Sequence, residues 1–188
     1  MAQKLVRFIS LEEFKRVLKE EKDKKFRLAY ILAFGSGLRI SEIVGYKRTF
    51  QKKVDGELKT CVTEYPPLTA DRVELEKHQI RITGKGEKER ITVTSPWLNK
   101  SMLRFLPLKI PRRTLQGRFS RLTKKVLGRN ISFHVLRHGF ANLMANEKNI
   151  PLPMLQIMLG HSRLDTTGIY TASNPVRAIE RAWNSYSD

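Results

Sequence analysis

Two short stretches of the sequence hold side chains that could act together on a phosphate group. HVLRH places His134 and Arg137 three residues apart, so on a helix the two side chains share one face. A guanidinium can form a bidentate hydrogen bond to two phosphate oxygens, and an imidazole beside it can donate or relay a proton. LGHSRLDTTGIYT adds His161 and Tyr170. A phenol has an ordinary pKa of about 10, so Tyr170 could attack a phosphate at neutral pH only with cations nearby.

Each of these residues also has a plainer interpretation. His134 and His138 lie four residues apart, which is also the spacing of a metal-binding pair on a helix. We expect no metal, because no acidic residue or cysteine pair lies nearby in sequence and Arg137 would repel a cation. His138 also fits a hydrogen-bonded core histidine, and His161 fits a residue near a helix C-terminus, where it interacts with the helix dipole. Tyr170, taken alone, fits a core residue.

Two further segments offer charged groups that could complete such a site. GLRISEI puts Arg39 where a helix is predicted to begin, and Glu42 one turn on can pair with Arg39 or a neighbour and fix its orientation. In GKGEK, glycines flank Lys85 and let a hairpin loop carry the lysine close to a ligand, with Lys88 as a competing candidate. Taken alone, both segments are better explained as ordinary charged surface. Together with the first two stretches, they supply the groups for phosphoryl transfer without a metal.

The elements that must position these residues are mostly helices. Ser10 and Glu13 predict a capping box that opens the first helix. Apolar spacing, with glycines and prolines at the ends, predicts further helices over residues 25–37, 38–45, 96–108, 114–128, 132–147, 151–162 and 175–188. From about Phe50 to Thr94, β-branched residues indicate strands, and residues 79–94 fit a hairpin with GKGEK as its loop. The sequence therefore predicts an α+β fold, a mostly helical domain with a small antiparallel sheet.

The charge of the chain favours a polyanionic partner. The formal net charge is +18 with a pI of about 10.3, and no Asp or Glu occurs from Arg90 to Asn146. Surfaces that merely face solvent normally mix both signs, so this stretch predicts a surface that meets phosphates. The candidate DNA-contact residues within it are Arg112, Arg113, Arg118, Arg121, Lys124 and Lys125.

Other features of the sequence narrow the partner and the compartment. No apolar run approaches the roughly 20 residues that a membrane span needs. We find no clear basic amphipathic helix with bulky aromatic residues, so nucleic acid is a better partner than a membrane surface. Cys61 is the only cysteine, which excludes disulfides within the chain and fits a reducing compartment. We therefore expect a cytoplasmic, nucleoid-associated protein.

In this order, GLRISEI, GKGEKER, HVLRHGFA and LGHSRLDTTGIYT closely resemble the motifs of the catalytic domain of tyrosine recombinases. This family comprises phage-type integrases and chromosome-dimer-resolving recombinases. The resemblance runs from about Ser10 to Ala172, which is most of the chain. By this resemblance the catalytic residues are Arg39, Lys85, His134, Arg137, His161 and Tyr170, supported by Glu42 and His138.

The resemblance also implies a role for each catalytic residue. Arg39 and Arg137 look like the clamp on the non-bridging oxygens of the scissile phosphate, where charge develops in the transition state. Lys85 looks like the general acid that protonates the leaving 5′ oxygen. Tyr170 looks like the nucleophile that forms a 3′-phosphotyrosyl bond. Two histidines look like hydrogen-bond donors to the phosphate, of which the first also assists proton transfer from the tyrosine: His134 and His161.

The implied function is site-specific DNA recombination, by an integrase of the kind that moves mobile elements and inserts viral genomes. Such an enzyme cleaves and rejoins double-stranded DNA without a metal, a cofactor or ATP. Strand exchange needs two duplexes and four active sites, so the resemblance implies a homotetramer on DNA and a monomer or weak oligomer when free. The alternatives are a type IB topoisomerase-like enzyme that relaxes supercoils as a monomer, and a non-catalytic basic DNA-binding module.

We divide the chain into a catalytic domain over residues 1–174 and a C-terminal tail helix over residues 175–188. The tail is amphipathic and could dock on a neighbouring protomer or fold back on its own domain. The segment at about residues 46–76 is longer and more irregular than the family pattern, which suggests an archaeal mobile-element integrase. Family members usually carry a separate helical domain before the catalytic one. Because the first helix begins at Ser10, we expect a catalytic fragment that lacks this N-terminal DNA-binding domain.

Overall fold

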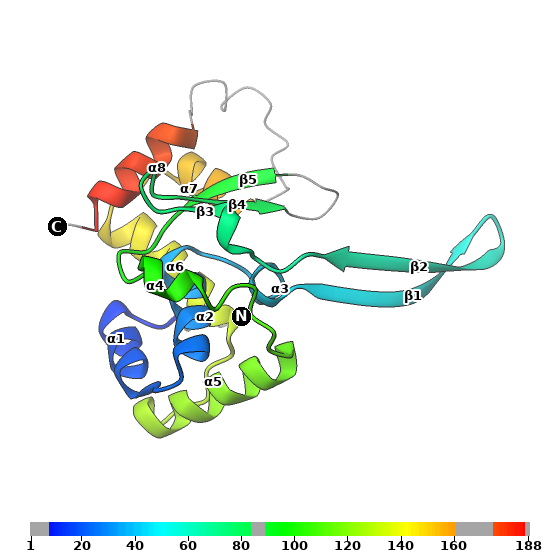
Figure 1. Ribbon diagram of the computed structural model, residues 1–188, viewed down its shortest axis with the longest axis horizontal. Coiled ribbons are helices and arrows are strands. Elements are labelled where there is room, and N and C mark those ends of the chain that lie inside the picture. The colour runs from blue at the N-terminus through cyan, green and yellow to red at the C-terminus, as the bar shows by residue number, and fades with distance from the viewer. Residues whose placement is uncertain (1–7, 84–88, 161–174, 187–188) are drawn as a thin grey trace, which may run out of the picture.

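The computed structural model describes residues 8–83, 89–160 and 175–186 (Figure 1). Its helices are α1 (Leu11–Glu20), α2 (Lys24–Gly35), α3 (Ile40–Val44), η1 (Ala70–Arg72), α4 (Lys100–Leu103), α5 (Arg112–Leu127), α6 (His134–Asn142), η3 (Leu143–Glu147), α7 (Leu152–Leu159) and α8 (Pro175–Asn184). Its strands are β1 (Tyr46–Val54), β2 (Glu57–Tyr65), β3 (Val73–Glu74), β4 (Gln79–Thr83) and β5 (Glu89–Val93). The predicted α+β fold is confirmed, with two small antiparallel sheets rather than one.

Helix α2 forms the centre of the core. Residues 28–35 are all buried, as expected for a helix that is apolar on every side. Helices α1 and α6 pack against it, and Phe14 of α1 stacks on Phe34 with ring centroids 4.0 Å apart. The predicted capping box is present, because Ser10 Oγ accepts from Glu13 N at 3.2 Å and Glu13 Oε2 accepts from Ser10 N at 3.1 Å.

The three-stranded sheet, in the order β3–β4–β5, contains the hairpin that the sequence predicted over residues 79–94. Strands β4 and β5 pair antiparallel along their whole length. Ile80 and Ile82 are buried on one face of the sheet, and Val93, which is paired with Gln79, is buried on the other face. Helices α7 and α8 contact β5, which places the end of α7 beside this hairpin (Figure 1).

The segment of residues 46–76, which departs from the family pattern and in which strands were predicted from about Phe50, is mostly a regular β-hairpin. Strands β1 and β2 pair in continuous register, and Asp55 and Gly56 between them both have positive φ, as a type I′ turn requires. The hairpin forms a sheet of its own and extends away from the rest of the protein (Figure 1). None of its residues belongs to the buried core, so the apolar–polar alternation of a half-buried strand is missing. The Asp-Gly pair was the available hairpin signal.

Two predicted helices have different limits in the structure. The helix predicted over residues 96–108 is reduced to the single turn α4, and the helix predicted over residues 132–147 changes after Asn142 into the π-helical turn η3. Among the described helices, none is long and apolar enough to cross a membrane.

The tail helix α8 packs on its own domain in this chain. Ile179 and Ala182 are buried, and α8 contacts α7 and β5. Trp183 stacks on His78 with ring centroids 3.6 Å apart, and the Tyr186 hydroxyl donates to the backbone oxygen at the end of α2 at 2.6 Å. These contacts correspond to the folded-back alternative, and exchange of the tail between protomers stays a prediction.

Candidate active site

A glycine turn between α2 and α3 positions Arg39. Gly37 has a φ of 69°, and a Cβ there would lie 2.6 Å from the Phe140 ring, so glycine is required by both conformation and space. Arg39 is the N-cap of α3, and its backbone N and Nη1 donate to the Glu42 carboxylate at 2.7 and 2.9 Å. The predicted pairing of Arg39 with Glu42 is therefore present. The Arg39 side chain remains 38% exposed, which leaves it accessible to a ligand.

The Glu42 carboxylate joins three arginines from three different elements. Besides Arg39, Arg90 of β5 donates from Nη2 to Glu42 Oε2 at 2.9 Å, and Arg137 Nη1 of α6 lies 4.0 Å from the same oxygen. Glu42, Arg90 and Arg137 are each less than a tenth exposed. Three positive charges thus face one negative charge where water screens little. We call these four residues the arginine cluster, and its excess of positive charge favours a bound anion.

Arg137 connects the cluster to two neighbouring backbones. Its Nη1 donates to the Gly37 oxygen at 2.7 Å and its Nη2 to the Leu159 oxygen at 2.6 Å, so only part of its five N–H donors is used. Burial, and then repulsion from Arg39 and Arg90, lowers the pKa of Arg137 to about 9, although Glu42 acts in the opposite direction. The side chain is still a cation at pH 7. A bound anion would relieve the repulsion among the arginines.

The two histidines of α6 lie on one face of the helix, as their spacing predicted. The rings of His134 and His138 meet edge to face with centroids 4.5 Å apart, and both side chains are exposed. The interpretation of His138 as a core histidine is therefore wrong. Partial burial, and then the charges of His138, Arg137 and Arg39, lowers the pKa of His134. His134 is thus neutral at pH 7 and able to accept a proton.

Arg90 is the member of the site that the sequence did not single out. Within the described part of the chain its Nε and Nη1 are buried and have no hydrogen-bond partner. Burial lowers the pKa of Arg90, and the charge of Arg39 also lowers it, although the Glu42 carboxylate raises it. The Arg90 side chain lies directly under Gly160, where a Cβ would come within 2.6 Å of Arg90 Nε. In the sequence, Arg90 is one of many cations in a stretch without acidic residues. Its position just after the GKGEK loop was the one signal that could have placed it near the candidate site.

Three of the predicted catalytic residues, Lys85, His161 and Tyr170, lie outside the described residues, as does the competing Lys88. The described chain nevertheless reaches the arginine cluster just before His161. The Leu159 oxygen accepts from Arg137, and Gly160, the left-handed C-cap of α7, covers Arg90. The structure therefore brings together Arg39, Glu42, His134, Arg137 and His138, and adds Arg90.

Among the described residues, no group of three or more His, Cys, Asp or Glu side chains is placed so that it could hold a metal ion. The charges that surround Glu42 are all guanidinium groups, which bind anions. The donor set therefore suits a phosphate.

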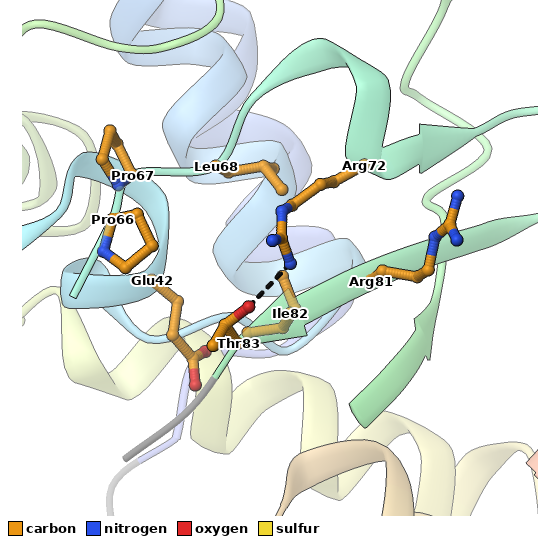
Figure 2. Close-up of a pocket in the computed structure, with 8 residues that line it drawn as sticks. All are labelled: Glu42, Pro66, Pro67, Leu68, Arg72, Arg81, Ile82 and Thr83. Carbon is orange, nitrogen blue, oxygen red and sulfur yellow. Dashed lines mark hydrogen bonds between the residues drawn. The ribbon is translucent and has the colours of Figure 1, made fainter. Parts of the chain in front are cut away.

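A pocket on the sheet side of Glu42 shows how the hairpin is held (Figure 2). Arg72 Nη1 donates to Thr83 Oγ1 at 2.6 Å and to Glu89 Oε1 at 3.4 Å. Thr83 ends β4 and Glu89 begins β5, so Arg72 holds both strands where the loop of residues 84–88 starts and ends. Leu68 N donates to the Glu42 backbone oxygen at 3.0 Å, which fixes the same region to α3.

The candidate DNA-contact residues are not equivalent. Five of them are exposed on α5: Arg112, Arg113, Arg121, Lys124 and Lys125. Arg118 is different, because its Nε and Nη2 donate to the nearly buried Glu21 carboxylate at 3.0 and 2.6 Å and its guanidinium lies 4.2 Å over the Phe26 ring. Arg118 therefore connects α5 to the end of α1, and its charge is already compensated.

Comparison with known sequences points to one family. Residues 102–177 match the sequence model described as the Phage integrase family. The tyrosine recombinase XerD of Lacticaseibacillus casei is 29% identical over 167 residues, which cover 77% of this chain and 49% of XerD. A tyrosine recombinase XerC of Neisseria meningitidis is 30% identical over 159 residues, covering 74% of this chain and 44% of XerC. The chain thus spans about half the length of the curated relatives it matches.

Comparison with solved structures gives the same fold. The integrase of mycobacterium phage Brujita superposes with a TM-score of 0.57 and 22% identity, over 97% of this chain and 60% of the integrase. The XerA recombinase superposes with a TM-score of 0.58 and 19% identity, over 96% of this chain and 65% of XerA. The XerH recombinase, in a pre-cleavage complex with its difH substrate, superposes with a TM-score of 0.51 and 22% identity, over 93% of this chain and 53% of XerH. The motifs, the fold and these relatives together support a catalytic domain of the tyrosine recombinase family.

Proposed function

We propose that this chain catalyses site-specific DNA recombination, as an integrase that cleaves and rejoins double-stranded DNA through a 3′-phosphotyrosyl intermediate. The observation that carries the proposal is the arginine cluster, in which three guanidinium groups surround one carboxylate. Fixed cations of this kind stabilise the charge that develops on a phosphate in the transition state. In a two-metal nuclease, metal ions stabilise this charge, and the guanidinium groups can do the same without a metal.

The proposed phosphate site lies between Arg39 and Arg137. Arg39 is partly exposed and approaches the phosphate from the surface, whereas Arg137 is held rigidly by two carbonyl oxygens. Glu42 supports the arginines, and the exposed His134 and His138 lie on the same helix as Arg137. Positioned donors of this kind do not have to reorganise when the charge develops.

The proposed reaction conserves the energy of the phosphodiester bond. The Tyr170 oxygen attacks the phosphorus, the bond from phosphorus to the 5′ oxygen breaks, and Lys85 supplies the proton that the leaving oxygen takes up. His134, with its lowered pKa, takes the proton of the phenol, and His161 donates a hydrogen bond to a phosphate oxygen. Attack by a 5′ hydroxyl on the phosphotyrosine reverses these steps and restores DNA and phenol, so ATP is not required.

The positions of the other tyrosines support Tyr170 as the nucleophile. Burial raises the pKa of Tyr30 and Tyr186, whose hydroxyls donate hydrogen bonds inside the protein. Tyr46 and Tyr65 stack on each other at the base of the β1–β2 hairpin, with ring centroids 6.0 Å apart. These are the remaining tyrosines of the chain, and each has another structural role.

Double-stranded DNA is the proposed partner. The XerH recombinase, which shares this fold, was solved in complex with its difH DNA substrate. The net charge of +18 on this chain fits the same kind of ligand. We propose that residues 1–174 act as the catalytic unit, that four copies assemble on two duplexes, and that α8 is exchanged between protomers on assembly. The protein would then act in the cytoplasm of its host, associated with the nucleoid.

Trapping the covalent intermediate tests this function. The probe is a pool of duplexes with a randomised segment beside a nick, so that the short cleaved fragment diffuses away and religation fails. We expect an adduct that survives denaturing gel electrophoresis, with related sequences enriched in the trapped DNA. No adduct at any salt concentration would contradict the proposal. Relaxation of supercoiled plasmids by the monomer, whatever their sequence, would favour a topoisomerase instead.

A further inference from the structure

The β1–β2 hairpin takes no part in the proposed catalytic site, and its two faces carry different charges. Residues directly opposite each other on paired antiparallel strands point to the same face. One face, which we call the basic face, carries the exposed cations Arg48, Lys52 and Lys59, with Glu57 at the tip as its only acid.

The opposite face is close to neutral and partly apolar. Its Lys47 is paired with Glu64 at 2.9 Å, which leaves Lys53 as its remaining cation. Leu58 and Val62 on this face are 70% and 56% exposed. The basic face therefore carries three cations against one acid, and the opposite face two cations against one acid.

One pair on the basic face is unfavourable in the free protein. Lys52 and Lys59 are directly opposite each other in the register, and like charges in this position destabilise a hairpin. Both side chains are exposed, and within the described chain neither is paired with an acidic side chain. An isolated two-stranded ribbon is only marginally stable, so this repulsion needs compensation. A polyanion lying along the basic face would supply it.

The basic face continues onto helix α5. Tyr46 and Phe50 lie on the same face as Arg48, and the Arg112 guanidinium sits 4.7 Å over the Tyr46 ring. Arg112 begins α5 and is one of the candidate DNA-contact residues. The base of the basic face therefore meets the first residue of α5, which is itself a cation.

We propose that the basic face of the β1–β2 hairpin binds the phosphate backbone of duplex DNA outside the catalytic site. Strands of nine residues span about 30 Å, which is close to one turn of B-DNA, and the major groove admits a two-stranded ribbon. Arg48, Lys52 and Lys59 contact phosphates, and the Lys52–Lys59 repulsion falls when DNA is bound. The proposal rests on the proposed function, because it takes DNA as the substrate.

Two double variants that remove equal charge test the proposal. Lys52→Gln with Lys59→Gln neutralises the basic face, and Lys47→Gln with Lys53→Gln neutralises the opposite face of the same hairpin. Binding of the full chain to a random duplex of about 40 base pairs is measured across a salt series. Loss of two phosphate contacts makes the slope of log K against log salt shallower by about 2, and we expect this only for the basic-face variant. Equal slopes for the two variants would overturn the proposal.

The competing occupant of the hairpin is a second copy of this chain. In that case the wild-type chain would sediment as a dimer, and Leu58→Ser with Val62→Ser would dissociate it. The basic-face variant would then bind DNA as the wild type does. These two results together would overturn the proposal. The salt series needs no cleavage, so it can be run on Tyr170→Phe protein. If wild-type protein formed no adduct but the slopes differed as expected, the catalytic proposal alone would fail. If the adduct formed and the slopes were equal, only the hairpin proposal would fail.

Discussion

Arg90 Nη2 lies 2.9 Å from Glu42 Oε2, although the two residues are 48 positions apart in the sequence. This ion pair joins the first residues of β5 to helix α3, and through Glu42 it joins the β4–β5 hairpin to Arg39 and Arg137. Both partners are less than a tenth exposed, so the pair is not a surface contact. The carboxylate offsets part of the repulsion among three arginines and leaves the excess charge for a phosphate.

Removing the Glu42 charge should destabilise the folded protein strongly. In Glu42→Gln three buried or half-buried guanidinium groups face no carboxylate, and loss of one partner of a buried pair costs about 3–5 kcal/mol. The free energy of unfolding in urea measures this. The matched control is Glu89→Gln, since Glu89 is 64% exposed and pairs with Arg72 at 3.4 Å, and its loss should cost less than about 1 kcal/mol. Sulfate should restore more stability to Glu42→Gln than to the control, and equal effects of sulfate would argue against an anion site.

The contact between Gly160 and Arg90 can be separated from backbone strain. Gly160 and Gly128 are both left-handed C-caps, with φ of 62° and 72°, so alanine at either should cost about 1–2 kcal/mol. A Cβ at Gly160 would collide with Arg90, whereas a Cβ at Gly128 meets nothing within 4 Å. Displacing Arg90 disturbs Glu42, which positions the proposed phosphate donor Arg39. We therefore expect Gly160→Ala to slow adduct formation by up to about 100-fold and Gly128→Ala to leave it unchanged. Equal rates for the two variants would show that Arg90 does not need its present position.

The lowered pKa of His134 predicts a dependence on pH. Between its folded-state pKa and the ordinary value of about 6.5, the unfolded chain binds more protons, so stability rises with pH through this window. Stability should therefore fall as the pH drops below about 6.5, and His134→Asn should lose that part of the decline. Titration of the imidazole by NMR in the DNA-free protein gives the pKa directly. A value at or above the ordinary one would contradict the lowered pKa that burial and the neighbouring charges imply for His134.

The general acid can be assigned with a modified substrate. In DNA with a 5′-bridging phosphorothiolate the leaving sulfur needs no proton, so this substrate should rescue only a variant that has lost the general acid. We expect Lys85→Ala to cleave the phosphorothiolate nearly as fast as the wild type and to be about 100-fold slower on ordinary DNA. Lys88→Ala should behave alike on both substrates. Rescue of Lys88→Ala would move the role to Lys88.

Local sequence signals were sufficient for much of the fold and for part of the site. The Ser10–Glu13 capping box, the hairpin over residues 79–94 and the pairing of Arg39 with Glu42 all depend on residues close in sequence. Helical spacing also placed the His134 and His138 rings on one face.

What the sequence missed depends on contacts between distant segments. The ion pair of Arg90 and Glu42 and the bidentate contact of Arg118 with Glu21 span 48 and 97 residues, and no local pattern encodes them. The exposure of His138 follows from how α6 packs on α2, which periodicity alone did not settle. Strands were predicted only from about Phe50 and the continuous β1–β2 pairing was not, because a ribbon outside the core need not alternate apolar and polar residues.

The most direct test of the proposed nucleophile is to identify which tyrosine carries DNA after trapping. Adduct made with the nicked pool is digested with nuclease and protease, and the nucleotide-bearing peptide is located by mass spectrometry. The proposed mechanism places the nucleotide on Tyr170. It predicts no adduct from Tyr170→Phe and a normal yield from the control Tyr65→Phe, which alters the stacked hairpin base. A nucleotide on any other residue, or an undiminished adduct from Tyr170→Phe, would contradict it.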